Sequence, residues 1–211
     1  MPSDFYQELS EYCQRDIELV KLRCEGASTE LAWLFPTYKD KVLDYYKDTD
    51  LYIFGLTRYQ EQLKGVAFHE WLEQFISNYD IKSMLDFGGG IGEYTIIGCK
   101  EGIQVIYQDI EYSKTWEYAT WRFEKHEVDP ILWDENHSID RDFDLIVAMD
   151  VLEHLENPEP VIEAMAKHCK YLIINPDLIK FNYMFPEHIS HYDIKPYFYN
   201  VQNYLWKNKN A

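Results

Sequence analysis

A glycine-rich turn between a buried strand and a helix constrains the fold of this chain more than any other feature. The segment 84–94 is MLDFGGGIGEY, in which an apolar run leads directly into Gly88, Gly89, Gly90 and Gly92. Glycines allow a tight turn and let a ligand approach the backbone where a Cβ would block it. The following helix directs free N–H groups toward that ligand. The turn therefore predicts a ligand site at the end of the first central strand.

The details of the turn separate ligand classes. The dinucleotide pattern G-x-G-x-x-G, started at Gly88, needs a third glycine where this chain has Glu93. The phosphate-binding P-loop pattern also fails, because no Gly-Lys-Ser/Thr follows. We expect Asp86 and Glu93 to place carboxylates near the site. This arrangement disfavours a pyrophosphate and favours a ligand that carries positive charge.

An acidic residue follows the second apolar run, in VIYQDI. Asp109 lies 21 residues after Gly88 (109 − 88), near the spacing of about 20 at which an acid binds ribose hydroxyls. A carboxylate accepts both hydrogen bonds of a vicinal diol. A helix N-cap is the alternative role for Asp109, but the glycine turn upstream favours ribose binding.

Short apolar runs alternate with helical stretches after residue 80. We expect strands at 84–87, 105–108, 130–133, 145–149 and 171–175, and helices at 92–101, 113–126 and 158–168. This order is typical of an α/β fold with a parallel sheet, helices on both faces and right-handed crossovers. The run at 130–133 is the weakest strand, because strands tolerate a proline such as Pro130 poorly.

The N-terminal part of the chain has helical periodicity instead. We expect helices over 4–24, 28–35, 38–47 and 58–78, with Ser3 or Asp4 as the first N-cap, Gly26 as a stop and an interruption or bend near Gly65. The predicted organisation is a helical lid or cap region at 1–80 and a ligand-binding core at 81–211 that ends in an aromatic segment.

Composition excludes several classes of function. The 211 residues include 20 Lys+Arg and 37 Asp+Glu, so the net charge of -17 disfavours nucleic acid or an anionic membrane as partner. The N-terminus has no secretory pattern, and no window approaches the roughly 20 apolar residues of a membrane span. The four cysteines are far apart and form no C-x-x-C pair. We therefore expect free thiols in a cytoplasmic protein.

Three motifs carry a family resemblance. LDFGGGIG, the acid Asp109 and FDLIVAMDVLEHLENP at 143–158 resemble the class I S-adenosylmethionine-dependent methyltransferases, and the last resembles their small-molecule branch, including the ubiquinone-biosynthesis type. The resemblance covers about 80–176. It implies a Rossmann-like, mostly parallel sheet and S-adenosyl-L-methionine as cofactor. The chain after the fifth strand shows no convincing hairpin pattern, so we expect a shortened C-terminal strand pair. Either the sheet is trimmed or YFYNVQNYLW supplies one irregular strand. A trimmed sheet leaves an open edge, and we expect a homodimer to cover it.

The resemblance also implies roles for individual residues. The expected cofactor-binding residues are Asp86, Gly88, Gly90, Gly92, Asp109, Ile110, Asp134 and Asp150, with Asn136 as a weaker candidate. Asp150 would face cofactor or acceptor. The expected catalytic residues are Asp150, His154, His188 and His191, although each histidine has a structural role as its alternative. The H-x-x-H spacing of His188 and His191 can suggest a metal pair, but no nearby cysteine or acidic cluster has ligand spacing, so no metal is expected. The candidates for substrate contact are Arg58, Tyr59, Tyr183 and Tyr192.

The expected activity is methyl transfer from S-adenosyl-L-methionine to a small organic molecule, mainly through proximity and orientation. Two alternatives remain open. The first is another reaction of the same cofactor, cyclisation or elimination that releases methylthioadenosine, and the second is a non-catalytic cofactor-binding subunit. The aromatic residues crowded at 1–60 and 178–199 suggest a lid over the cleft, because aromatic faces attract cations.

Overall fold

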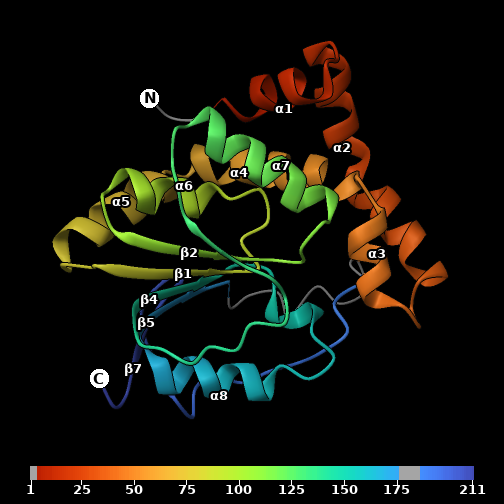
Figure 1. Cartoon of the computed structure of the whole chain (residues 1–211). Coiled ribbons are helices and arrows are strands. Elements are labelled where there is room, and N and C mark those ends of the chain that lie inside the picture. The colour runs from red at the N-terminus through yellow and green to blue at the C-terminus, as the bar shows by residue number, and fades with distance from the viewer. Residues whose placement is uncertain (1–3, 176–185) are drawn as a thin grey trace.

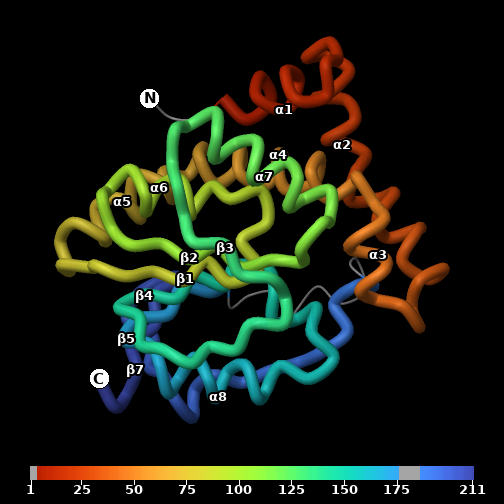
Figure 2. The backbone as a smooth tube through the Cα atoms, in the orientation of Figure 1, coloured from red at the N-terminus to blue at the C-terminus, as the bar shows by residue number. Residues whose placement is uncertain are grey.

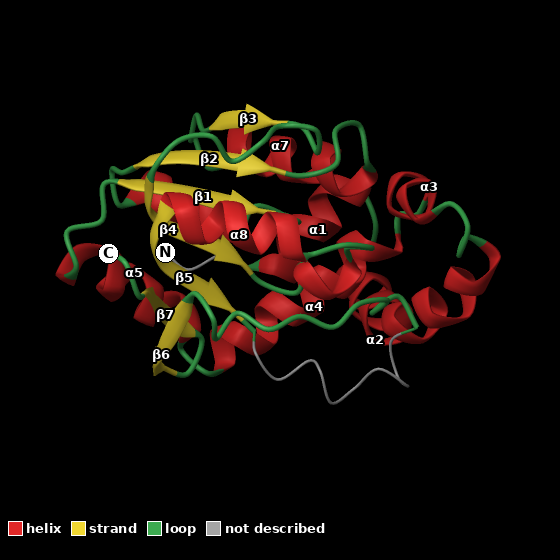
Figure 3. Ribbon diagram, turned by 90° about the horizontal axis from the view of Figure 1, so that it is seen from below, coloured by secondary structure: helices red, strands yellow, loops and turns green. Residues whose placement is uncertain are grey.

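A seven-stranded sheet in the order β3-β2-β1-β4-β5-β7-β6 forms the centre of the protein (Figure 3). The computed structural model describes residues 4–175 and 186–211. The strands are β1 (Ser83–Phe87), β2 (Gln104–Gln108), β3 (Ile131–Trp133), β4 (Phe143–Ala148), β5 (Cys169–Ile174), β6 (Phe198–Gln202) and β7 (Leu205–Asn208). β1 to β5 are mutually parallel. The chain order reverses between β1 and β4, which is where open α/β sheets bind ligands.

Helices cover both faces of the sheet (Figure 1). One face carries α4 (Leu51–Gly65), α5 (Phe68–Asn78), α6 (Glu93–Lys100) and α7 (Lys114–Lys125), and the other carries α8 (Glu159–His168). Successive residues of β1 point to opposite faces of the sheet, so both faces are apolar and need cover. Met84 packs in the cluster of α5 and α6, and Leu85 packs in the cluster of α8. The predicted α/β, Rossmann-like fold is confirmed, with all five expected strands and three expected helices of the core. Pro130 is tolerated because it directly precedes an edge strand.

The N-terminal helices differ from the prediction. The expected helix over 4–24 is wrong, because Gln14 adopts a left-handed conformation (φ 53°) that ends α1 (Phe5–Cys13). Asp16 then caps α2 (Ile17–Leu34), which runs through Gly26 instead of stopping there. Gly26 is tolerated inside the helix because a Cβ would meet only the Glu30 carboxylate, at 3.4 Å. At the first helix, Asp4 is the N-cap and accepts a hydrogen bond from the backbone of Gln7 at 3.1 Å.

The rest of the N-terminal region connects these helices to the core. A 3-10 turn, η1 (Phe35–Thr37), leads to α3 (Val42–Asp48), and Figure 2 traces the chain from there back along α4. The predicted helix over 58–78 is interrupted where expected: α4 ends at Gly65, and Ala67 (φ 56°) precedes α5. α1 and α2 pack on α4, and α1 also contacts α7.

The sheet ends in a complete antiparallel strand pair, so the expectation of a trimmed sheet or a single irregular strand was wrong, although both strands are short. β6 and β7 form an antiparallel pair, and β7 inserts beside β5, with Leu205 opposite Ile173. The turn between the two strands contains Asn203 in a left-handed conformation (φ 43°) instead of a glycine. The sequence pattern did not predict this hairpin, because the strands are short and the turn lacks the usual glycine.

Two further expectations concern the whole chain. The four cysteines are free thiols, as predicted. Among residues 4–175 and 186–211, no helix has the length and apolar character needed to cross a membrane.

Candidate active site

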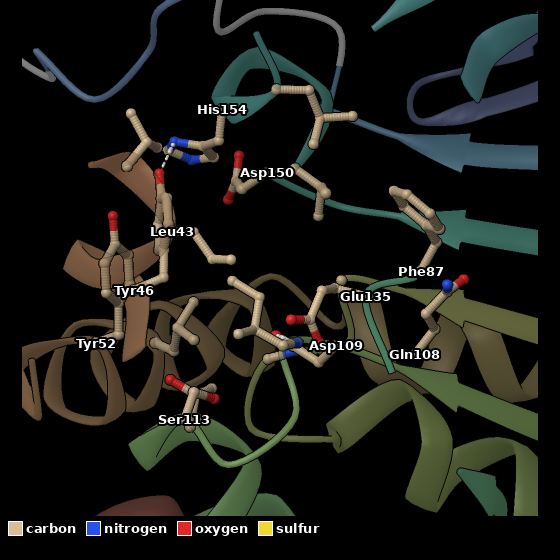
Figure 4. A pocket seen from close by; sticks show the side chains of 18 of the residues that line it. Leu43, Tyr46, Tyr52, Phe87, Gln108, Asp109, Ser113, Glu135, Asp150 and His154 are labelled. Atoms are coloured by element: carbon tan, nitrogen blue, oxygen red, sulfur yellow. Dashed lines mark hydrogen bonds between the residues drawn. The ribbon is translucent and has the colours of Figure 1, made fainter. Parts of the chain in front are cut away.

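A cavity of about 370 Å³ opens at the carboxyl ends of β1, β2 and β4 (Figure 4). Its floor comes from the last residues of β1 and β2 and from the segments that follow β1, β2 and β4: Phe87, Gly88, Gly90, Gln108, Asp109, Ile110, Met149, Asp150, Val151 and His154. Its opposite wall comes from α3 and α4: Val42, Leu43, Tyr46, Tyr52 and Leu56. A mostly apolar cavity with a few convergent polar groups is typical of a small-molecule site.

The glycine turn brings bare backbone to the cavity surface. Gly88 has φ +64° and Gly90 has φ +56°, a left-handed region that residues with a Cβ rarely adopt. A Cβ on Gly88 would lie 2.5 Å from the side chain of Val151, and one on Gly90 would lie 3.0 Å from Leu56. Both positions therefore favour glycine for its conformation, and Gly88 requires it for space as well.

Asp109 is tied to the glycine turn. Its Oδ2 accepts a hydrogen bond from the backbone N–H of Gly90 at 2.7 Å, and its Oδ1 accepts one from Ile110 at 2.6 Å. Burial raises the pKa of Asp109 to about 6, against the lowering effect of these two hydrogen bonds. Tyr107 completes the arrangement by donating its hydroxyl to the carbonyl oxygen of Gly90 at 2.7 Å. Asp109 and Ile110 both line the cavity, and their binding of the cofactor stays a prediction.

Asp86 and Glu93 do not face the cavity, which corrects the argument that they place carboxylates beside the ligand. Asp86 is buried and accepts hydrogen bonds from the backbone and hydroxyl of Thr95 at 3.0 and 2.7 Å. Glu93 binds Arg122 on α7, with Nη2 and Oε2 2.6 Å apart. Gly92 (φ +76°) also faces away, because a Cβ there would lie 2.5 Å from Phe123. These three residues hold the turn against α6 and α7.

Asp150 lies in the turn after β4 and lines the cavity. Its backbone is left-handed (φ 55°), a conformation that is costly for a residue other than glycine and is concentrated at functional sites. Asn175 donates its amide to Oδ1 at 3.3 Å. Burial raises the pKa of Asp150 to about 6, although hydrogen bonds from Tyr59 and Asn175 act in the other direction. The carboxyl is therefore ionised at neutral pH and still titrates close to it.

His154 ends the short 3-10 helix η2 (Leu152–His154) and also lines the cavity. Its Nδ1 lies 2.9 Å from the hydroxyl of Tyr46, drawn in Figure 4, and 3.1 Å from the carbonyl oxygen of Glu187. Burial lowers the pKa of His154 to about 3. Its neighbour Glu153 is only 4% exposed, and burial raises the pKa of that carboxyl to about 8.

The loop after β3 presents Glu135, and not the expected Asp134, to the cavity. Asp134 turns outward, where it accepts hydrogen bonds from the backbone of Asn136 and from His137, each at 2.9 Å. Glu135 accepts one from Lys47 of α3 at 3.0 Å and one from the backbone of Glu111 at 3.1 Å. Sequence reasoning missed Glu135 because consecutive residues of a loop carry no periodic signal.

The other expected residues that the structure describes lie outside the lining of this cavity. Tyr59 reaches the site only through its hydrogen bond to Asp150, and Arg58 points to the carbonyl oxygen of Glu25 at 3.4 Å. His188 packs edge-on against His154, with ring centroids 4.8 Å apart, whereas His191 is exposed. Tyr192 packs in the cluster of α8, and Tyr183 lies outside the described residues.

The apolar wall from α3 and α4 was not assigned to individual residues beforehand. The available signal was the crowd of aromatic residues in the N-terminal third, which includes Tyr46 and Tyr52. That composition pointed to the correct region, but only the packed helices identify the residues that line the cavity.

A family model described as a methyltransferase domain matches residues 59–193. The matched region begins within α4 and includes β1 to β5, so it contains the glycine turn, Asp109 and Asp150. No curated protein matches the chain.

The chain is similar to several solved structures at low sequence identity. A putative caffeoyl-CoA O-methyltransferase from Staphylococcus aureus is 15% identical, covering 74% of this chain and 98% of that one, with a TM-score of 0.50. An S-adenosylmethionine-dependent methyltransferase from Clostridium acetobutylicum is 19% identical over 50% of this chain and 48% of that one, with a TM-score of 0.44. The N-terminal domain of EvdMO1, crystallised with SAH bound, is 15% identical over 50% and 48%, with a TM-score of 0.45. The chain thus spans about half the length of the latter two structures.

Proposed function

Since this chain belongs to the methyltransferase domain family, we propose that it transfers a methyl group from S-adenosyl-L-methionine to a small organic molecule. The observation that carries the proposal is the joint position of Gly88, Gly90 and Asp109 at one end of the cavity. Bare backbone beside a carboxylate that can accept two hydroxyl hydrogen bonds suits an adenosyl ligand. The ubiquinone-biosynthesis branch remains a prediction within this proposal.

The residues of the cavity divide into two groups. Asp109, Ile110 and Glu135 follow β2 and β3 and suit the adenosyl part of the cofactor. Asp150 and His154 follow β4, opposite the apolar wall of α3 and α4, and suit the acceptor. When bound, S-adenosyl-L-methionine supplies a methyl group on a positively charged sulfur, so the protein mainly has to orient the acceptor and exclude water.

Asp150 is the best candidate for a general base in this cavity. A base works best when its pKa lies near the operating pH, and the pKa of Asp150 is raised to about 6. The pKa of His154, lowered to about 3 by burial, makes that imidazole a much weaker proton acceptor. An acceptor hydroxyl beside Asp150 would lose its proton to the carboxylate, whereas an already neutral amine or a thiolate has a free lone pair and would need no base.

The net charge of -17 supports a small-molecule acceptor over a nucleic acid. The free thiols support a reducing compartment, and we propose a cytoplasmic location. A homodimer also remains a prediction. Because the β6–β7 hairpin covers β5, its basis is now the edge strand β6, where Tyr199 and Val201 are exposed. Light scattering of the full chain at working concentration tests it, and a monomer would refute it.

We propose in addition that α3 and the start of α4 close over bound ligands as a lid. The support is their position as a cavity wall. α1 is not part of this lid, because Glu8 of α1 forms an ion pair with the buried Arg122 of α7, with Oε2 and Nε 2.8 Å apart. Limited proteolysis with and without cofactor tests the lid. Protection of residues 36–50 by cofactor is expected, and equal cleavage rates in that segment would count strongly against the proposal.

The decisive experiment combines binding and product analysis. Calorimetry with S-adenosyl-L-methionine and S-adenosylhomocysteine should show one site per chain, and the variant Asp109→Ala should bind at least tenfold more weakly. Incubation with labelled cofactor and a panel of small acceptors should then give S-adenosylhomocysteine and a labelled product. Release of methylthioadenosine would instead identify cyclisation or elimination. Binding without turnover by any acceptor would favour a non-catalytic subunit, and absence of binding would overturn the proposal.

A further inference from the structure

We propose that Glu153, His154 and His188 form a binding site for a divalent first-row transition-metal ion, in the wall of the cavity. The ligand atoms of these three residues all lie within 4.8 Å of one another. Two imidazoles and one carboxylate form a donor set that suits Zn²⁺, Fe²⁺, Co²⁺ or Mn²⁺ better than the all-oxygen ions Mg²⁺ and Ca²⁺. The inference is independent of the proposed methyl transfer.

The carboxylate is the strongest indication. Glu153 is 4% exposed, and its Oε1 is buried with no hydrogen-bond partner in the described part of the chain. A buried carboxylate oxygen without a partner is costly, and native proteins rarely leave one. A cation bound at Oε1 would remove that cost, and the two imidazoles beside it would complete three protein ligands.

The orientation of His154 agrees with a ligand role. Its Nδ1 lies 3.1 Å from the carbonyl oxygen of Glu187. With the proton on Nδ1, His154 donates to this carbonyl oxygen, which can only accept, and the hydroxyl of Tyr46, 2.9 Å away, can accept as well. Nε2 then keeps the lone pair that a metal requires. Metal-ligating histidines commonly donate their other nitrogen to a backbone carbonyl in this way, because the hydrogen bond fixes both ring and tautomer.

Backbone contacts hold the two segments of the site together. The backbone N–H of Ser190 donates to the carbonyl oxygen of Glu153, and its hydroxyl donates to that of Leu152, both at 3.1 Å. These bonds fasten the segment that carries His188 to η2, so the rings of His188 and His154 meet edge to face at 82°. In a tetrahedral Zn²⁺ site, where each ligand atom lies about 2.1 Å from the ion, two ligand atoms lie about 3.4 Å apart. The ligand atoms here lie within 4.8 Å of one another. Small side-chain rotations would therefore suffice to close the site.

The site differs from the pair that the sequence suggested. His188 and His191 have H-x-x-H spacing, but His191 is exposed, and the partners of His188 come from residues more than 30 positions earlier. Because His154 also lines the cavity, a fourth coordination position would be open to an oxygen or nitrogen atom of a molecule bound there. This arrangement, with three protein ligands and one open position, is typical of catalytic metal sites.

Metal titration of the full-length protein tests the proposal. Protein stripped with a chelator is titrated with Co²⁺, followed by visible absorption, and with Zn²⁺, followed by calorimetry. We expect one ion per chain, with a Zn²⁺ dissociation constant at or below the micromolar range, and a higher unfolding temperature with Zn²⁺. Failure of the wild-type protein to bind either ion overturns the proposal without reference to any variant.

Three variants locate the site. Glu153→Gln, which preserves shape, and His188→Ala should each weaken Zn²⁺ binding at least a hundredfold, whereas His191→Ala, the exposed matched control, should bind like the wild type. Circular dichroism confirms that each variant is folded. Equal binding by all four proteins would mean adventitious surface binding and would refute the site. Calorimetry with S-adenosyl-L-methionine on the same samples is a separate readout, so failure of the metal site and failure of the proposed function are distinguishable.

Discussion

Arg122 and Glu93 form a buried ion pair, with Nη2 and Oε2 2.6 Å apart, directly behind the glycine turn. Arg122 is fully buried, and it also donates to Glu8 of α1 at 2.8 Å and to the carbonyl oxygen of Ile91 at 2.7 Å. Burial alone would raise the pKa of Glu8, but hydrogen bonds from His126 and Arg122 lower it to about 2. One guanidinium thus connects the N-terminal helices, the glycine turn and α7.

Removal of this guanidinium should destabilise the whole protein. Arg122→Ala leaves two buried carboxylates without their partner, so we expect the free energy of unfolding to fall by about 3–5 kcal/mol. Urea denaturation measures the change. The control is Lys125→Ala on the same helix, where a partly exposed pair with Glu11 is lost, and it should cost no more than about 1 kcal/mol. Equal losses of unfolding free energy in the two variants would show that the buried ion pairs of Arg122 stabilise the protein no more than a surface ion pair does.

Two glycine-to-alanine variants can test whether Gly88 is needed for cofactor binding or only for its positive φ. Gly88→Ala and Gly102→Ala both place a Cβ at positive φ, which should cost each variant roughly 1–2 kcal/mol of stability. The clash with Val151 should add to this loss in Gly88→Ala. At Gly102 nothing lies within 4 Å of that Cβ, whereas at Gly88 the Cβ lies 2.5 Å from Val151. Cofactor affinity by calorimetry should therefore fall at least tenfold, or about 1.4 kcal/mol, in Gly88→Ala alone. Similar affinities in both variants would contradict the predicted role of Gly88.

Cofactor affinity should depend on pH through Asp109. Burial raises the pKa of its carboxyl from 3.8 to about 6, so the group is ionised above pH 6 and takes up a proton as the pH falls through that value. Only the ionised form accepts both ribose hydroxyls. The dissociation constant should therefore rise by up to about tenfold per pH unit below pH 6.

Asp109→Asn provides the control for this pH dependence. The amide does not titrate, so the variant should bind weakly and lack the component of the pH dependence that belongs to Asp109. Calorimetry at pH 5, 6, 7 and 8 on both proteins gives the difference. Parallel pH profiles would assign the dependence to another group.

Two neighbouring acids should differ sharply in their effect on binding. Glu135 lines the cavity and is held by Lys47, whereas Asp134 faces outward to His137. Glu135→Gln should therefore weaken cofactor binding about tenfold or more, the scale of a lost charge-assisted hydrogen bond, while Asp134→Asn should leave it within about twofold. The reverse order, measured by calorimetry, would restore the expectation based on sequence.

Asp150 can be separated from the binding residues by kinetics. Asp150→Asn should lower kcat by about 10²–10⁴ for an acceptor that must lose a proton, because a general base contributes a factor of this size. The KM for cofactor should change much less. A panel that contains thiol and hydroxyl acceptors checks the assignment, since a thiolate needs no base. A uniform loss with both acceptor types would indicate that Asp150 positions ligands instead.

Local patterns were sufficient for much of the core. Each strand from β1 to β5 is a short apolar run, and the helices between them have clear periodicity, so their order could be predicted from the sequence. The N-terminal helices were harder, because the break at Gln14 depends on a single left-handed residue that carries no glycine signal. The β6–β7 hairpin was missed for the same reason, since Asn203 occupies its turn.

The sequence by itself determined the α/β order, the glycine turn and the acid that follows β2, because each depends on residues close together in the chain. Only the tertiary structure decided where neighbouring side chains point. Glu93 turns away from the cavity because Arg122, 29 residues later, binds it, and Glu135 turns inward beside Lys47, 88 residues earlier. The tertiary structure also places His188 next to Glu153 and His154, which are more than 30 residues earlier in the chain. Such contacts depend on how helices and loops pack against the sheet, and a local pattern of residue types contains no information about that packing.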